Sequence, residues 1–243
     1  MIIRAVIVPH PPLLVPELVG ESRIRTEPVR AACVTAARRL ADVAHDWVAV
    51  AADPNGPVTL PADAHGTFAG YGVDVPVHFD PSRSDTVAVD LGLPLPALVA
   101  GWLREQAGAR RVRVRLIEPD LPAEDCRREG AEIADDLAGP EPVGLLVLGD
   151  GSNRHTERAP ARPDDRAGAF DDGVRAALAA ADPAALLALD PDLAAELGAM
   201  GRAAWQVLAG AALAVGGEWT GDVLYSDQPF GVAYHVAVWD PVS

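Results

Sequence analysis

The chain opens with a strand that prolines bring to a stop, and this feature limits the possible folds more than any other. The run Ile2–Val8 is aliphatic with a single charged residue, a pattern typical of a strand buried on both faces of a sheet. Pro9, Pro11 and Pro12 follow, and proline cannot continue a central strand because it lacks a backbone N–H and fixes φ. We therefore expect His10 at the rim of the sheet, at the carboxyl edge where open α/β sheets bind ligands.

Two further apolar runs end in polar corners in the same way. Residues 47–52 lead into Asp53-Pro54-Asn55-Gly56-Pro57, and residues 143–148 lead into Gly149-Asp150-Gly151-Ser152-Asn153. If these strands are parallel to the first, all three corners meet at one edge of the sheet. No internal repeat, low-complexity tract or linker divides the chain. The sequence therefore predicts one α/β domain over residues 1–243, with a central, mostly parallel sheet flanked by helices.

Composition excludes several classes of partner. The formal net charge of -15 disfavours binding to nucleic acid or to an anionic membrane surface. No apolar run is long enough to cross a bilayer, and the N-terminus has no signal-peptide pattern. Cys33 and Cys126 show no metal-ligand spacing and are expected to be reduced thiols, which favours a cytoplasmic location.

The remaining elements follow from periodicity and breaker residues. Helices are predicted over about 28–43, 95–107 and 123–137, and three more begin near Asp165, Pro183 and Pro191, the last continuing past Trp205. Strands are predicted over 73–79, 111–117, 221–225 and 232–239. The stretch from Gly56 to Gly72 is expected to be a long loop, and such loops in compact domains are usually functional or mobile.

Several of these segments resemble one known family. Residues 8–14 are similar to the start of the class III extradiol ring-cleavage dioxygenases of the catalytic-subunit-B (LigB-like) type and of the related Memo-like proteins. The corner at Asp53–Pro57 resembles the family's Ser-Pro-His-Gly-Pro, and residues 66–72 resemble its Gly-Asp-Phe-x-x-Phe-Gly. Residues 149–154 resemble its Gly-Asp-Leu-Ser-His-Arg, and residues 198–201 stand where it has a Gly-Glu-Cys-Gly type segment. The resemblance spans most of the chain and implies a LigB-like fold.

The resemblance also implies a metal site, which this sequence keeps only in part. In the family, two imidazoles and a carboxylate hold Fe(II), and a further histidine moves protons during ring opening. His10 matches the first metal ligand, but Asn55 stands at the second. Asn153 stands at the acid/base position, and Ala199 or Met200 replaces the last ligand. An asparagine amide cannot exchange a proton at neutral pH, so the resemblance implies the fold while removing most of its chemistry.

Nearby residues offer a rebuilt site as an alternative. Asp53 and His65 could complete a facial triad with His10, and His155 lies two residues beyond Asn153, within reach of the same space. The catalytic candidates are therefore Asn153 and His155. The metal candidates are His10 with Asn55, Asp53 and His65, and the candidate pocket residues are His10, Asp53, Asn55, Asp150 and Ser152.

Most of these residues also have an ordinary structural explanation. Asp53 and Asp150 are typical of turn-capping residues at strand ends. His65 and His155 are expected to be solvated loop histidines, and His235 is expected to serve packing. Ser152 lacks the Gly-x-Ser-x-Gly pattern of a nucleophile turn, which excludes an α/β-hydrolase interpretation at that position.

Three functions follow as hypotheses. The first is a LigB-like protein that binds a small molecule, with aromatic compounds among the candidates, or a partner, and has little or no ring-cleavage activity. The second is an active Fe(II)-dependent dioxygenase acting on a catechol-type substrate through the rebuilt ligands. The third is a structural subunit, with the proline-rich loop 159–163 as an interface. We expect no tightly bound cofactor, Fe(II) if the site is functional, and a homo-oligomer as one possible assembly.

Overall fold

The central element is a seven-stranded sheet in the order β3-β6-β2-β7-β1-β9-β8. The structure is a computed structural model that describes residues 1–20, 23–83 and 88–242. Strands β1, β7, β2 and β6 are mutually parallel, whereas β9, β8 and β3 each run antiparallel to a neighbour. The strands are β1 (Ile2–Val8), β2 (Asp46–Ala52), β3 (Val58–Thr59), β6 (Arg111–Ile117), β7 (Val143–Leu148), β8 (Trp219–Asp227) and β9 (Tyr234–Pro241).

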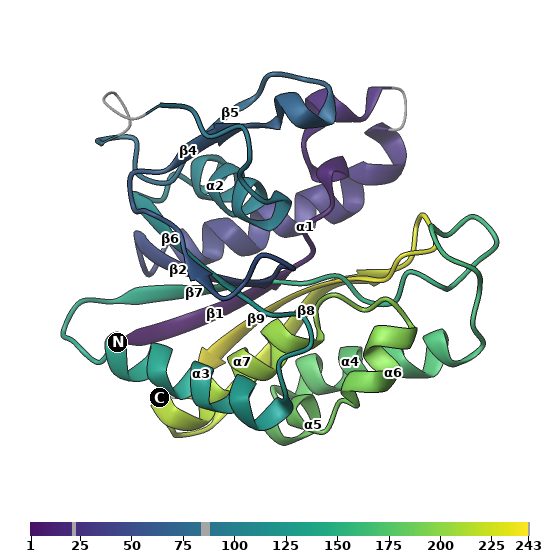
Figure 1. The fold of residues 1–243 in the computed structure, drawn as a ribbon. Helices are drawn as coiled ribbons and strands as arrows, with labels where there is room; N and C mark the ends of the chain where they lie inside the picture. Colours follow the sequence, from purple (N-terminus) through teal and green to yellow (C-terminus); the bar gives the residue numbers. More distant parts are fainter. Residues whose placement is uncertain (21–22, 84–87, 243) are drawn as a thin grey trace.

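Helices cover both faces of this sheet, so the predicted fold class is confirmed. Figure 1 shows α1 (Arg23–Ala41) and α2 (Leu95–Ala107) on one face, together with the small β4–β5 sheet (His65–Thr67 and Pro76–His78). Five helices lie on the other face: α3 (Ala123–Asp136), α4 (Arg166–Ala180), α5 (Pro183–Leu187), α6 (Pro191–Glu196) and α7 (Arg202–Val215).

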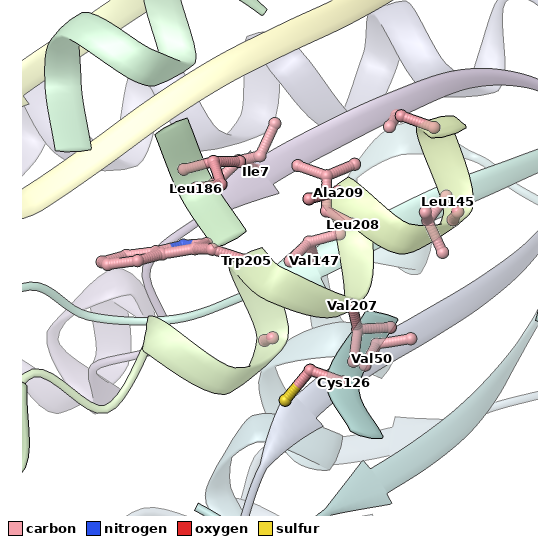
Figure 2. Packing of buried hydrophobic residues seen from close by; sticks show 14 of the residues in the cluster. Ile7, Val50, Cys126, Leu145, Val147, Leu186, Trp205, Val207, Leu208 and Ala209 are labelled. Atoms are coloured by element: carbon pink, nitrogen blue, oxygen red, sulfur yellow. The ribbon is translucent and has the colours of Figure 1, made fainter. Parts of the chain in front are cut away.

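Alternate residues of each central strand enter two separate hydrophobic cores. Val6 and Val8 pack in the core beneath α1 and α2, whereas Ile7 packs in the core beneath α3, α4, α5 and α7. Figure 2 shows the second core, with strand residues such as Val147 beneath Trp205 and its neighbours on α7. The period of two along a strand explains why these runs are apolar throughout.

Two predicted elements are wrong. The helix expected from Pro191 past Trp205 is two helices, α6 and α7, separated at residues 197–201. Gly198 has φ +64 there, a left-handed conformation that ends a helix. The long loop at 56–72 instead contains β3, β4 and a 3-10 helix at Phe68–Tyr71, and Phe68 is fully buried.

Other boundaries moved by a few residues. The first helix begins at Arg23 rather than near Pro28, and the strand expected at 73–79 covers only Pro76–His78. The helix and strand expected at 95–107 and 111–117 have the predicted bounds. Within the described ranges, the structure contains no helix that is both long and apolar enough to span a membrane.

Candidate functional site

The three polar corners lie at one edge of the sheet, as predicted. Val8 of β1 pairs in parallel with Leu148 of β7, and Leu148 also pairs with Ala51 of β2. The three strands therefore end together, and the corners that follow them share the carboxyl edge. This is the edge at which parallel α/β sheets place their ligands.

His10 is held at this edge by the corner after β7. Its backbone N–H donates to Asp150 Oδ1 over 2.9 Å, and its ring Nδ1 lies 3.9 Å from the same oxygen. His10 is buried, and Nδ1 has no hydrogen-bond partner. Asp150 therefore joins the ends of β1 and β7 and does not act as a simple cap within its own turn.

The corner after β2 closes on itself. The backbone N–H and the side-chain amide of Asn55 both donate to Asp53 Oδ1, over 2.9 and 2.8 Å. This Asx turn is the structural role predicted for Asp53. Asn55 is exposed, and its amide nitrogen is committed to its own turn.

His65 lies in β4, where it is buried rather than solvated. Its ring stacks on that of His78, the residue opposite it in β5, with ring centroids 5.4 Å apart. The expectation of a solvated loop histidine is wrong because β4 and β5 form a sheet that the sequence pattern did not reveal.

These positions do not fit the iron site that the resemblance implies. Across residues 1–20, 23–83 and 88–242, no three His, Cys, Asp or Glu side chains form a group that could hold a metal ion. His10, Asp53 and His65 are therefore not arranged as a facial triad. Asn55 and Asn153 bring no imidazole to replace them.

Asn153 packs against the segment that separates α6 from α7. Its backbone N–H donates to Leu197 O over 3.1 Å, and a Cβ built on Gly198 would lie 2.5 Å from Asn153 Oδ1. That oxygen is buried and has no hydrogen-bond partner. In the same segment Ala199 is buried and Met200 is 37% exposed, and neither supplies a carboxylate.

A buried polar network links the β7 corner to α4 and β9. Asp171 of α4 accepts from the N–H of Ser152 at 3.2 and 3.3 Å. It lies 2.6 Å from His155 Nε2 and 3.3 Å from His235 Nε2, and His235 Nδ1 lies 2.9 Å from Ser226 Oγ. His155 is therefore not a solvated histidine, and the role of His235 goes beyond packing.

Three members of this network were not predicted from the sequence: Asp171, His235 as a hydrogen-bonding group, and Ser226. One signal was available for Asp171, because residues 167, 171, 174 and 178 share one face of a helix and the other three are Ala, Val and Leu. An acid within an apolar stripe is buried, and a buried carboxylate needs hydrogen-bond donors.

Two cavities flank this region, and His10, Asn55 and Asn153 line neither. The larger has a volume of about 300 Å³ and is formed by residues 119–120 at the end of β6 and by residues 191–202. It is lined mostly by Pro, Ala and Gly, and its charged lining residues are Arg202, Asp120 and Asp192. The smaller, of about 160 Å³, lies between α4 and the β8–β9 hairpin and is lined by Asp171, His155, His235 and Ser226 among others.

The comparisons with known proteins support the fold alone. No protein-family model matches the sequence, and a search of curated proteins also gave no match. Among solved structures, the chain is similar to the uncharacterized protein JW3007 from Escherichia coli K12. The TM-score is 0.51 at 12% sequence identity, over 98% of this chain and 99% of that chain.

Proposed function

We propose that this chain is a small-molecule-binding protein on a LigB-like fold, with little or no iron-dependent ring-cleavage activity. The observation that carries the proposal is the cavity of about 300 Å³ beside the carboxyl end of β6, with the buried Arg202 in its wall. Ligand sites are typically concave, mostly apolar and supplied with a few polar groups that fix orientation. This cavity has that composition.

Arg202 suggests the chemical class of the ligand. It is 3% exposed, and its terminal nitrogens donate to Pro119 O, Leu121 O and Gln206 Oε1. No carboxylate of the described residues lies within ion-pair distance, and burial lowers the pKa of this guanidinium. Asp120, which also lines the cavity, acts on Arg202 electrostatically from beyond that distance. Buried charges are normally paired closely, so an anionic group on the ligand would supply a nearer counter-charge.

The resemblance to ring-cleaving dioxygenases supports the pocket rather than the reaction. Ring cleavage of the family's type needs two imidazoles and a carboxylate on Fe(II) and a group that transfers protons. Here Asn55 is tied to Asp53 in a turn, and Asn153 cannot transfer a proton. Losing general acid–base catalysis alone typically costs about 100- to 10,000-fold.

Oxygen uptake and product absorbance test the absence of ring cleavage. The protein is loaded anaerobically with Fe(II) and mixed with catechol or protocatechuate in aerated buffer. We expect no yellow ring-opened product above the rate of free Fe(II). Turnover of several per second would overturn this part of the proposal and favour the rebuilt-ligand dioxygenase.

Calorimetric titration tests the binding function with benzoate and protocatechuate as anionic probes and catechol as the neutral one. We expect the carboxylates to bind at least about tenfold more tightly than catechol, and Arg202→Gln to abolish the difference. Arg202→Lys is the matched control, because it also removes the buried guanidinium but keeps the positive charge. Failure of both anions to bind, or equal binding by the Gln variant, would contradict the proposal and leave a structural subunit as the better hypothesis.

A further inference from the structure

We propose that Ser226, His235 and Asp171 form a nucleophilic triad that hydrolyses short acyl esters in the cleft between α4 and the β8–β9 hairpin. This site is separate from the cavity beside Arg202 and does not depend on it. The three side chains form one continuous chain of hydrogen bonds, and all three line the cleft.

The protonation of His235 follows from its two partners. A carboxylate can only accept hydrogen bonds, so we assign the ring proton of His235 to Nε2, which lies 3.3 Å from Asp171 Oδ1. Nδ1 then has a free lone pair, and Ser226 Oγ lies 2.9 Å from it. The serine hydroxyl therefore donates to a neutral imidazole, which is the arrangement that activates a serine nucleophile. The two ring nitrogens exchange places relative to the serine protease triad, but the relay is chemically equivalent.

The scaffold holds each member in position. Ser226 and His235 are opposite one another in the antiparallel pair β8–β9, so the backbone fixes their distance. The His235 ring is almost fully buried and meets the edge of Trp205, with ring centroids 6.1 Å apart. Asp171 is fixed from two sides, by the Ser152 N–H and by His155 Nε2. Rigid placement of this kind is what a general base requires.

The cleft indicates the substrate. Its volume of about 160 Å³ has room for a short acyl chain. Asp171, Asp172 and Asp227 line it against a single Arg175, so its charge disfavours anionic substrates. Among the lining side chains, Arg175, which lies 3.5 Å from Asp172, and Gln228 are hydrogen-bond donors, and we assign to them the stabilisation of negative charge on the carbonyl oxygen. We therefore infer a small acyl ester of a neutral alcohol.

The reaction balances without a cofactor. Ser226 Oγ attacks the ester carbonyl carbon while its proton passes to His235 Nδ1. The C–O bond to the alcohol then breaks, and the imidazolium returns that proton to the departing oxygen, which leaves an acyl-serine. Water attacks the acyl-serine carbonyl and gives a proton to His235 Nδ1. The bond to Ser226 Oγ then breaks, the imidazolium returns that proton to Oγ, and the carboxylic acid leaves.

Covalent labelling with diisopropyl fluorophosphate tests the proposal on the unmodified chain. The reagent phosphorylates an activated serine with loss of fluoride, and peptide mass spectrometry locates the adduct. We expect one adduct, on Ser226, with formation slowed at least about 100-fold in His235→Gln and Asp171→Asn. Ser226→Ala should remove it, whereas Ser82→Ala, a serine hydrogen-bonded to Asp80, should label like the unmodified protein.

The same variants are then compared in hydrolysis of 4-nitrophenyl acetate. We expect the unmodified protein to release a burst of nitrophenolate equal to the enzyme concentration. The variants that lose the Ser226 adduct should also lose this burst. Absence of any adduct on Ser226 in the folded, unmodified protein would overturn the proposal, and that outcome does not depend on whether a variant folds. Equal labelling of the His235→Gln variant would also overturn it, because the serine would then react without its base.

Discussion

Among single residues, Asp46 at the start of β2 pairs with two arginines. Arg110 donates to both of its oxygens over 2.7 Å, and Arg111 donates to Oδ2. The hydrogen bond from Arg110 is the main reason that the pKa of Asp46 is lowered, with Arg111 adding to the effect. Arg111 is the first residue of the parallel strand β6 and is the register partner of Asp46, and Arg110 directly precedes it, so the cluster holds the start of β2 against the start of β6.

We predict that Asp46→Asn lowers the free energy of unfolding at pH 7 by at most about 1 kcal/mol, because the arginines are exposed and water screens the pairs. A lowered pKa in the folded state means that the stabilisation is present above the unfolded pKa and is lost as pH falls through the folded one. Urea unfolding at pH 7 and at pH 2–3 should therefore show a difference that shrinks in acid. Asp42→Asn is the control, because within the described part of the chain its side chain has no hydrogen-bond or ion-pair partner. It should leave the free energy of unfolding unchanged at both pH values.

Individual residues of the candidate site differ in how far the sequence could predict them. The rim position of His10 followed from the prolines around it, and the Asx turn at Asp53 followed from residue type. The partners of His155 and His235 could not be predicted, because Asp171 lies 16 residues from the first and 64 from the second. Contacts between separate elements depend on how α4 docks against β9, and local patterns carry little information about docking.

At the scale of elements, the contact between α3 and α7 depends on two glycines. A Cβ on Gly130 would lie 2.1 Å from Val207 O, and a Cβ on Gly210 would lie 2.2 Å from Arg127 O. The backbones therefore approach each other closely, and any side chain forces the helices apart. We predict that Gly130→Ala destabilises the protein by about 1–3 kcal/mol, the usual cost of overpacking.

The matched control for this change is Gly173→Ala in α4. Nothing lies within 4 Å of a Cβ at that position, so the higher helix propensity of alanine should stabilise the protein by up to about 1 kcal/mol. Chemical unfolding of both variants measures the two changes. A stabilised Gly130→Ala variant would show that α3 and α7 are not packed this closely.

The break between α6 and α7 illustrates the limit of periodicity at this scale. Apolar residues continue through 191–210 at helical spacing, which predicted one helix. The chain instead turns at Gly198, and Gly201 lies against the corner after β7, where a Cβ on Gly149 would be 2.3 Å from Gly201 Cα. The turn is set by the close approach of two backbones. This is a tertiary contact, and in the sequence only the glycines indicate it.

At the scale of the whole molecule, the sheet separates two cores, and each core contains one cysteine. Cys33 of α1 lies in the core beneath α1 and α2, and Cys126 of α3 lies in the opposite core. Both thiols are fully buried, and neither is part of a disulfide. Burial is the main cause that raises the pKa of both, and it raises the pKa of Cys126 to about 11. The two thiols therefore report on the two faces of the sheet independently.

This arrangement predicts how stability changes in alkali. The thiolate is the reactive form, so neither cysteine should react with an aromatic disulfide reagent at pH 8 until the protein opens. Since both folded pKa values are raised, the folded state keeps protons that the unfolded chain releases. The resulting stabilisation is complete below the unfolded pKa of about 8.5 and is lost as pH rises through the folded values. The free energy of unfolding should therefore fall above about pH 9. Cys33→Ala with Cys126→Ala should flatten the fall between about pH 9 and pH 10, before the tyrosines of raised pKa, whose unfolded value is about 10, add their own loss. Rapid reaction of either thiol in the native protein at pH 8 would show that the core on its side of the sheet is open to solvent.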